Sequence, residues 1–252
     1  MQAYSRAFAR VYNRYWTDFA KQLAPKILEF YEKTPLSGEN KIILDLCCGT
    51  GQLAVYFLEN GYEVIGVDLS EGMLHYAREN ASAYIENGKA EFIKADAADF
   101  KLNKQVGLVI SAYDSLNHLE NFEALSNCFQ SVYEVLVNEG YFIFDLNTRG
   151  GLLRWNRILI QDEEDVMIVN RGIYDISGKK AWMKISGFIK SANGFYERFD
   201  ETAFNSVFEC ELVRKELLEI GWKDVYFAQL PSLDIPIENP EKESRIFFVA
   251  KK

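Results

Sequence analysis

The most constraining feature of this chain is a short apolar run that breaks into glycines and then restarts as a helix. Residues 42–46 read Ile-Ile-Leu-Asp-Leu, and residues 47–51 read Cys-Cys-Gly-Thr-Gly. An apolar run bounded by glycine is typical of a buried parallel strand. Because Gly49 and Gly51 lack a Cβ, the backbone can approach a ligand closely, and the next helix would direct its free N–H groups at it. The pattern predicts a site for a nucleotide-type cofactor.

The composition favours a folded protein with a small partner. The chain has 252 residues, of which 48% are apolar, and this suits one α/β domain with an insertion or at most two small domains. It carries 28 basic and 37 acidic side chains, a net charge of -9. Such a balance opposes binding to nucleic acid or to an anionic membrane through charge alone. We therefore expect a small-molecule substrate and neither nucleic acid nor membrane as a partner.

The cysteines and the N-terminus indicate a reducing compartment. Cys47, Cys48, Cys128 and Cys210 have no repeating spacing, which predicts neither a disulfide framework nor a zinc site. No cationic residue stands beside Cys47 and Cys48, so we expect packed thiols rather than nucleophiles. The first six residues lack the apolar core of a signal peptide, and no stretch approaches the ~20 apolar residues of a membrane span. We expect a soluble cytoplasmic protein without a bound metal.

Strand-like and helix-like stretches alternate over the first 150 residues. Residues 5–33 place apolar side chains at three- and four-residue steps, which predicts an amphipathic helical segment with a break near Pro25. From residue 37 onward the alternation predicts right-handed crossovers and a parallel sheet. The expected strands are 41–46, 62–67, 89–93, 106–111 and 139–146, and the expected helices are 51–59, 71–82 and 121–137.

The pattern changes after Gly150 and Gly151. A short helix is expected at 152–160, and three strand-like runs separated by turn residues then predict an antiparallel meander. The acidic run 162–165 is expected to be a solvated loop. The strand-like runs are 165–176, 180–190 and 195–208, followed by a helix at 210–220 and strands at 222–229 and 245–251. These last two strands should pair antiparallel because no helix joins them.

The glycines alone do not identify the cofactor. Residues 49–54 also fit the relaxed dinucleotide pattern G-x-G-x-x-G/A, and Asp68 ends the second expected strand, where a carboxylate can hold a ribose hydroxyl. A nicotinamide-dependent oxidoreductase is therefore an alternative function at this point. Three further features bear on the choice: Asp45 inside the first strand, Met73 in the capped helix after Asp68, and Asp96 after the third strand.

Together these motifs resemble the class I S-adenosylmethionine-dependent methyltransferases, and within them the small-molecule type, similar to methyltransferase domains 25 and 11. The resemblance extends over nearly the whole chain. Its segments are 45–51 (similar to motif I), 67–70 with Met73 (motif II), 95–97 (the adenine-side acidic motif), 113–119 (Tyr-Asp-Ser-Leu-Asn-His-Leu, after the fourth strand) and 194–201 (part of the meander).

The resemblance implies a Rossmann-like three-layer α/β sandwich. Its sheet would have seven mostly parallel strands with an antiparallel last strand. The implied division is an N-terminal helical lid at 1–36, a cofactor-binding core at 37–150 and 209–252, and an inserted antiparallel meander at 151–208. The meander would cap the substrate or form a homodimer interface.

The resemblance also assigns roles to individual residues. Asp68 would accept hydrogen bonds from both ribose hydroxyls, Asp96 from the adenine amino group, and Asp45 would orient the methionine ammonium directly or through water. The expected cofactor-binding residues are Asp45, Cys47, Gly49, Gly51, Asp68, Leu69, Met73, Asp96, Ala97 and Ser111, with Tyr12 and Trp16 from the lid. The expected substrate residues are Tyr113, Asn117, Asn147 and Arg149, and the catalytic candidates are His118, Tyr113 and Asp114.

Two positions depart from the family pattern. Cys47 stands where motif I usually has its first glycine, and we expect the thiol to fit there without a positive φ. Ala203 stands where the meander of the family often carries a histidine, so a general base from that position is absent.

The implied reaction is in-line transfer of the sulfonium methyl group to an acceptor, leaving S-adenosylhomocysteine, with no metal. The rate would come mainly from holding the acceptor in line and excluding water. A non-catalytic S-adenosylmethionine-binding module is a further alternative. The sequence does not indicate the acceptor or the atom that is methylated.

Overall fold

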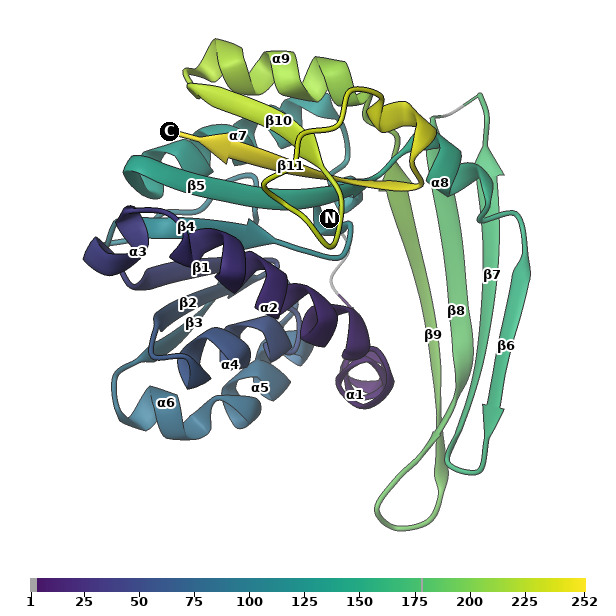
Figure 1. Ribbon diagram of the computed structural model, residues 1–252. Coiled ribbons are helices and arrows are strands. Elements are labelled where there is room, and N and C mark those ends of the chain that lie inside the picture. The colour runs from purple at the N-terminus through teal and green to yellow at the C-terminus, as the bar shows by residue number, and fades with distance from the viewer. Residues whose placement is uncertain (1–3, 178) are drawn as a thin grey trace.

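The protein is an α/β core with a tall antiparallel sheet beside it (Figure 1). The computed structural model describes residues 4–177 and 179–252. Residues 1–3 lie outside the described part, and so does Gly178, which falls between the expected strands 165–176 and 180–190. Within the described part, no helix has the length and apolar character needed to cross a membrane.

The core is built on a seven-stranded sheet with the order β10-β11-β5-β4-β1-β2-β3. Its strands are β1 (Ile42–Leu46), β2 (Glu63–Asp68), β3 (Ala90–Lys94), β4 (Val106–Ser111), β5 (Leu136–Asn147), β10 (Asp224–Ala228) and β11 (Arg245–Lys251). β11 runs antiparallel to both of its neighbours, and the other neighbouring strands pair in parallel. The expected fold, a mostly parallel seven-stranded sheet with an antiparallel last strand, is confirmed.

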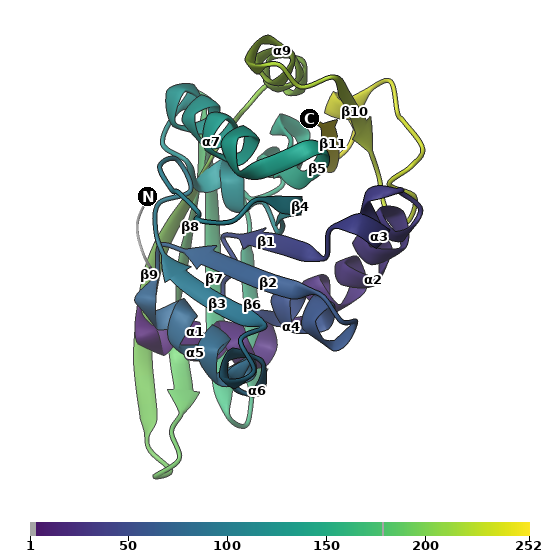
Figure 2. The ribbon, with the colours of Figure 1, turned by 90° about the vertical axis from the view of Figure 1, so that its left-hand side faces the viewer.

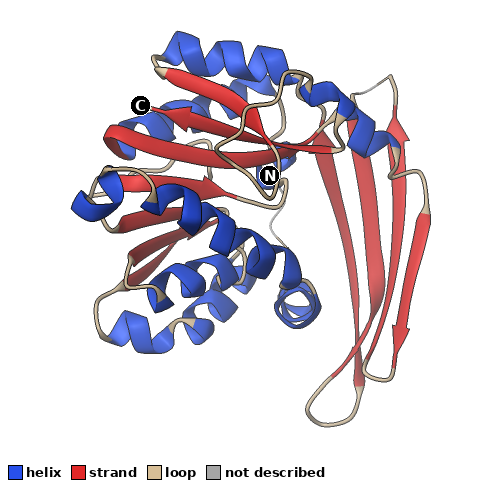
Figure 3. Ribbon diagram, viewed as in Figure 1, coloured by secondary structure: helices blue, strands red, loops and turns tan. Residues whose placement is uncertain are grey.

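Helices cover both faces of this sheet and make three layers (Figure 3). One face carries α2 (Asp18–Glu32), α4 (Gln52–Glu59) and α5 (Glu71–Asn80), and the other carries α7 (Phe122–Val135) and α9 (Cys210–Ile220). Ile43 and Leu44 are both buried, one in each layer. When helices cover both faces of a strand, the side chains on both faces are buried, so apolar residues follow one another instead of alternating with polar ones. This explains the apolar run at 42–46. The remaining short helices of the core are α3 (Leu36–Glu39), α6 (Ser82–Glu86), η1 (Ser115–His118) and η2 (Pro240–Lys242).

The N-terminal helical segment breaks earlier than expected. It forms α1 (Arg6–Tyr15) and α2, with the chain turning at Trp16 and Thr17, whereas Pro25 lies inside α2. The expected break near Pro25 was therefore wrong. The buried face of α2, including Leu23 and Ile27, packs on the core, and this packing outweighs the hydrogen bond that a proline removes.

The insert is a four-stranded antiparallel sheet, which we call the wing. After α8 (Arg149–Leu153) it comprises β6 (Ile158–Glu163), β7 (Val166–Asp175), β8 (Lys180–Lys190) and β9 (Tyr196–Ser206), paired in chain order. The expected helix at 152–160 was wrong, because the chain leaves α8 after Leu153 and residues 158–163 pair with β7. The acidic run 162–165 ends β6 and forms the tight turn to β7, where Asp165 pairs with Arg14 at 2.9 Å and Lys190 at 3.1 Å.

Helix α1 lies between the core and the wing (Figure 1), and in the view of Figure 2 it is partly hidden behind α5. It packs against α5 on one side and β9 on the other. Phe8 and Val11 of α1 share a buried cluster with Ile185 and Phe199 of the wing. The helix therefore joins two sheets that are otherwise connected at one end.

Candidate functional site

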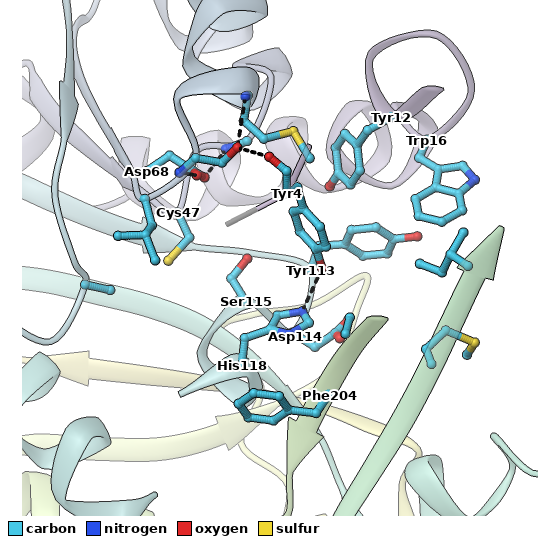
Figure 4. Close-up of a pocket in the computed structure, with 18 of the residues that line it drawn as sticks. Tyr4, Tyr12, Trp16, Cys47, Asp68, Tyr113, Asp114, Ser115, His118 and Phe204 are labelled. Carbon is cyan, nitrogen blue, oxygen red and sulfur yellow. Dashed lines mark hydrogen bonds between the residues drawn. The ribbon is translucent and has the colours of Figure 1, made fainter. Parts of the chain in front are cut away.

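A cavity of about 310 Å³ lies where the carboxyl ends of the core strands meet α1 and the wing. Its wall on the core side includes Cys47, Gly49, Asp68, Leu69, Ser70, Met73, Ala95 and Ala97. The opposite part includes Tyr113, Asp114, Ser115, His118, Asn147 and Arg245. The segment 4–16, which is shorter than the expected lid at 1–36 and which we call the lid below, supplies Tyr4, Tyr12 and Trp16 (Figure 4). The wing supplies Met183, Ile185, Thr202, Ala203 and Phe204. Segments far apart in the sequence thus converge on one site.

The loop after β1 has an unusual backbone. Cys47, Gly49 and Gly51 all have positive φ angles, of 61°, 55° and 81°. The expectation that Cys47 would fit without a positive φ was wrong, because this position requires the left-handed conformation that glycine adopts most easily. Burial raises the pKa of both the Cys47 and Cys48 thiols, so neither is a nucleophile at neutral pH.

Asp68 is the best-defined polar group on the core side. Its carboxylate accepts a hydrogen bond from the Gly49 N–H at 2.9 Å and another from the Ser70 N–H at 2.8 Å. Burial raises the pKa of Asp68, and these backbone hydrogen bonds oppose the shift. Each oxygen keeps a lone pair for a ligand, so the carboxylate is positioned to accept from two hydroxyl groups.

The Ser70 hydroxyl links this corner to the lid. It accepts a hydrogen bond from the Met73 N–H at 3.3 Å, which caps α5, and it donates to the Tyr4 carbonyl at 2.8 Å. The Tyr12 ring lies 3.6 Å from the position that a Cβ on Gly49 would occupy. The lid and the loop after β1 are therefore in direct contact.

Four expected cofactor residues do not line the cavity: Asp45, Gly51, Asp96 and Ser111. Asp45 lies buried in β1, where one carboxylate oxygen has no hydrogen-bond partner among the described residues. Burial raises the pKa of Asp45 to about 7, against the effect of a backbone hydrogen bond from Ala54. Gly51 caps α4, and Asp96 accepts from the Ala98 N–H at 2.9 Å beside the wall residue Ala97. The Ser111 side chain is buried next to the Cys47 thiol.

The turn after β4 is held by a buried ionic cluster. Tyr113 and Asp114 both have positive φ angles, and both of their N–H groups donate to the Asp145 carboxylate, at 2.7 and 2.9 Å. Arg245 at the start of β11 pairs with Asp145 and lies 2.5 Å from Asp114. Burial alone would lower the pKa of Arg245, but the two carboxylates raise it. The cluster fixes Tyr113 and Asp114 at the cavity.

His118 lies in the same part of the wall, in η1. Its Nε2 is 3.5 Å from the Tyr4 hydroxyl, and its ring also hydrogen-bonds to the Phe204 carbonyl. Figure 4 marks the contact with Tyr4 by a dashed line. Burial lowers the pKa of His118, while the Asp114 charge and the Phe204 carbonyl act in the opposite direction. The imidazole is therefore neutral at pH 7 and able to accept a proton.

The expected substrate residues divide into two groups. Tyr113 and Asn147 line the cavity, whereas Asn117 and Arg149 do not. Asn117 is fully buried and joins two strands, because it accepts from the Asn147 N–H at 2.8 Å and donates to the Ser206 carbonyl at 2.9 Å. Arg149 is half-exposed at the start of α8, with Glu209 at 4.0 Å.

Sequence reasoning missed several wall residues. Arg245 was detectable, since the last strand was expected to run antiparallel and its first residue then lies at the carboxyl edge of its neighbours. Tyr4 precedes the first helix, and Met183, Ile185 and Phe204 depend on how the wing is placed, for which the sequence has no signal. Ala203, the position of the missing histidine, does line the cavity.

Within the described residues, no group of three or more His, Cys, Asp or Glu side chains is arranged to hold a metal ion.

Comparison with known proteins places this geometry in a family. Residues 43–140 match the family described as methyltransferase domain. A putative methyltransferase from Geobacillus sp. (strain WCH70), GWCH70_2453, is 30% identical over 215 residues, which cover 84% of this chain and 85% of the relative. The chain belongs to the class I S-adenosylmethionine-dependent methyltransferases.

Solved structures agree with this assignment at the level of the fold. An S-adenosylmethionine-dependent methyltransferase from Clostridium acetobutylicum ATCC 824 is similar with a TM-score of 0.77 and 23% identity, over 97% of each chain. CalS10 with bound S-adenosylmethionine, an amino pentose methyltransferase from Micromonospora echinaspora, has a TM-score of 0.68 and 18% identity, over 100% of this chain and 98% of CalS10. Because the chain belongs to this family, S-adenosylmethionine is its cofactor.

The Arg245 cluster leads to a prediction about the stability of the methyltransferase. Arg245→Met leaves Asp145 and Asp114 buried without their cation, so we expect the free energy of unfolding to fall by about 3–5 kcal/mol. Urea denaturation followed by circular dichroism measures this change. The control is Arg198→Met on the wing, where the arginine side chain is 67% exposed and we expect a change within about 0.5 kcal/mol. Equal effects of the two substitutions would contradict a structural role for the cluster.

Proposed function

We propose that this protein transfers the methyl group of S-adenosylmethionine to a small-molecule acceptor held between the core and the wing. One observation carries the proposal: a single cavity contains the Asp68 corner on one side and the Tyr113–Asp114–His118 turn on the other, under the same lid. The amino pentose methyltransferase CalS10 offers one example of a small acceptor on a similar fold.

The cofactor would lie along the core side of the cavity. Asp68 would accept hydrogen bonds from the ribose hydroxyls, and Gly49 would let the backbone approach the ligand. Leu69, Met73 and Ala97 would contact the adenine ring. Asp96, next to Ala97 in the chain but outside the cavity wall, is the proposed partner of the adenine amino group. The unpartnered oxygen of Asp45 fits a water-mediated contact to the methionine ammonium.

The residues of this chain would position the acceptor, exclude water from the cavity and accept a proton. S-adenosylmethionine supplies a methyl group that is already activated by its sulfonium charge. Tyr12 and Trp16 cover the cavity and exclude water from the site of transfer. The Arg245 cluster holds the Tyr113–Asp114 turn, and we assign His118 the role of general base for an acceptor that carries a proton.

A binding and turnover experiment tests the proposal. Asp68→Asn removes the charge that receives the ribose hydroxyls, worth about 1.5–3 kcal/mol, so we expect S-adenosylmethionine affinity to fall about ten- to a hundredfold in calorimetry. Asp99→Asn, an exposed carboxylate one turn from Asp96, should leave the affinity unchanged.

The second arm incubates the wild-type protein with methyl-labelled S-adenosylmethionine and a metabolite extract, and mass spectrometry identifies the labelled product. Unchanged affinity of the Asp68 variant would refute the cofactor assignment. Tight binding without any labelled product would favour a non-catalytic binding module.

The role of His118 predicts a pH dependence. Only the neutral imidazole accepts a proton, and its pKa is lowered from the ordinary value of 6.5. We therefore expect kcat/KM to be level near pH 7 and to fall in acid below pH 6.5. His118→Gln should lower kcat about 10²- to 10⁴-fold and remove this acid limb, with the affinity for S-adenosylhomocysteine preserved. An unchanged acid limb in the variant would assign the titration to another group.

We also propose that the outer face of the wing pairs with a second copy of the chain. Ile158, Ile160, Ile173, Trp182 and Phe188 are exposed on this face, and an apolar patch of this kind marks an interface more often than a solvated surface. Ile160→Glu should convert a dimer to a monomer in light scattering after size exclusion. Phe195→Glu in the β8–β9 hairpin, also highly exposed, should not. A monomeric wild-type protein would refute the proposal.

A further inference from the structure

The acceptor side of the cavity carries an excess of negative charge. Asp114 lines the wall. Asp145 and Glu201 lie behind the wall: Asp145 accepts from the Asp114 N–H, and Glu201 of the wing is buried beside Ser5, next in the chain to the wall residue Tyr4. One cation, Arg245, pairs with both Asp114 and Asp145. Charges buried in a protein interior are screened far less than surface charges, so this excess acts inside the cavity.

Glu201 is the least compensated of these carboxylates. Its Oε1 accepts a hydrogen bond from the Ser5 N–H at 3.1 Å, and no cationic side chain pairs with it among the described residues. Two lysines of the neighbouring strand β8 are engaged elsewhere: Lys184 pairs with Asp200 at 3.4 Å, and Lys180 stands over the Phe204 ring and pairs with Glu120 at 2.6 Å. A buried carboxylate without a cation is costly unless a ligand provides the charge.

Tyr4 lies at the meeting point of these charges. Its pKa is raised by burial and by the charges of Asp114, Asp68 and Glu201, so all three carboxylates act on the same hydroxyl. Bound S-adenosylmethionine would add about one net positive charge, from its sulfonium, ammonium and carboxylate groups. Two carboxylates in the wall, Asp68 and Asp114, and two behind it, Asp145 and Glu201, then stand against two positive charges, and the site retains a negative excess.

The cavity wall is also aromatic. Tyr4, Tyr12, Trp16 and Tyr113 all line it. The Arg245 guanidinium already stands over the Tyr113 ring at 5.5 Å, which shows that this wall holds a cation. Aromatic faces next to carboxylates are the usual surroundings of bound ammonium groups in proteins.

We propose that the acceptor is an amine, which enters as an ammonium ion and is held beside Tyr4 by Asp114 and the aromatic wall, while the charge of Glu201 acts on it from behind the wall. This inference rests on the proposed methyltransferase function. A neutral alcohol or phenol would leave the negative excess without a partner, whereas an ammonium compensates it.

The chemistry of an amine balances with the residues at the site. The bound ammonium first gives one proton to His118 Nε2. The nitrogen lone pair then forms the bond to the methyl carbon, while the electrons of the carbon–sulfur bond pass to sulfur and leave neutral S-adenosylhomocysteine. The methylated nitrogen carries the positive charge, and His118 releases its proton to solvent. The product is therefore also an ammonium.

A matched pair of probes tests the inference by calorimetry on the full chain saturated with S-adenosylhomocysteine. Choline carries a trimethylammonium group, and 3,3-dimethylbutan-1-ol has the same shape with carbon in place of the charged nitrogen. We expect choline to bind at least ten times more tightly than the alcohol. Equal binding of the two, tighter binding of the alcohol, or no binding of choline would overturn the amine assignment.

Two variants test whether the charge of Glu201 strengthens the binding of choline. Glu201→Gln should weaken choline binding at least fivefold, because the substitution removes a buried negative charge and keeps the shape of the side chain. Glu219→Gln in α9, where the side chain is 60% exposed, makes the same charge change on the opposite layer and should leave binding unchanged. Equal effects of the two variants would mean that choline binding depends only on the net charge of the protein. That result would overturn the proposed ammonium site.

S-adenosylhomocysteine affinity separates this inference from the proposed function. If S-adenosylhomocysteine fails to bind the wild-type protein, the methyltransferase proposal itself fails. If it binds and the ammonium preference is absent, the amine assignment alone fails. Retained S-adenosylhomocysteine affinity in Glu201→Gln also shows that this variant is folded.

Discussion

One buried carboxylate organises the acceptor side of this protein. Asp145 in β5 accepts the N–H groups of Tyr113 and Asp114 and pairs with Arg245 from β11. Without those three interactions, two consecutive residues other than glycine would not remain in the left-handed conformation, which is unfavourable for each of them. The antiparallel insertion of β11 next to β5 is what brings Arg245 to this edge, so the topology of the sheet and the geometry of the site have a common cause.

The lid depends on a second set of contacts, which connect it to both sheets. Ser70 of the core and Glu201 of the wing each bind the backbone of residues 4 and 5. Further along α1, Arg10 pairs with Glu197 of the wing at 3.0 Å, while Asn13 accepts from Gln52 of the core at 2.8 Å. Helix α1 is therefore part of the cavity wall and also the element that sets the distance between core and wing.

Most of the core could be predicted from the sequence, because parallel strands buried on both faces leave an apolar run between turn residues. The Asp68 corner was predictable for the same reason, since its position follows from the end of β2. The sequence could not predict β6, because the short apolar run at 158–160 fits a strand and a helix equally well. Only its pairing with β7 makes it a strand. Nor could it predict that Asn117 faces inward, since that depends on β9 approaching from a distant part of the chain.

The lid has a consequence for how long ligands stay bound. Tyr12 covers the Gly49 side of the cavity, and Tyr4, only two helical turns earlier, contacts His118 on the acceptor side. One segment thus covers both sides of the cavity, and it joins α2 at the bend at Trp16 and Thr17. A displacement of this segment would expose both sides of the cavity to solvent together. The release of a ligand from either side would then depend on the same displacement rather than on two independent ones.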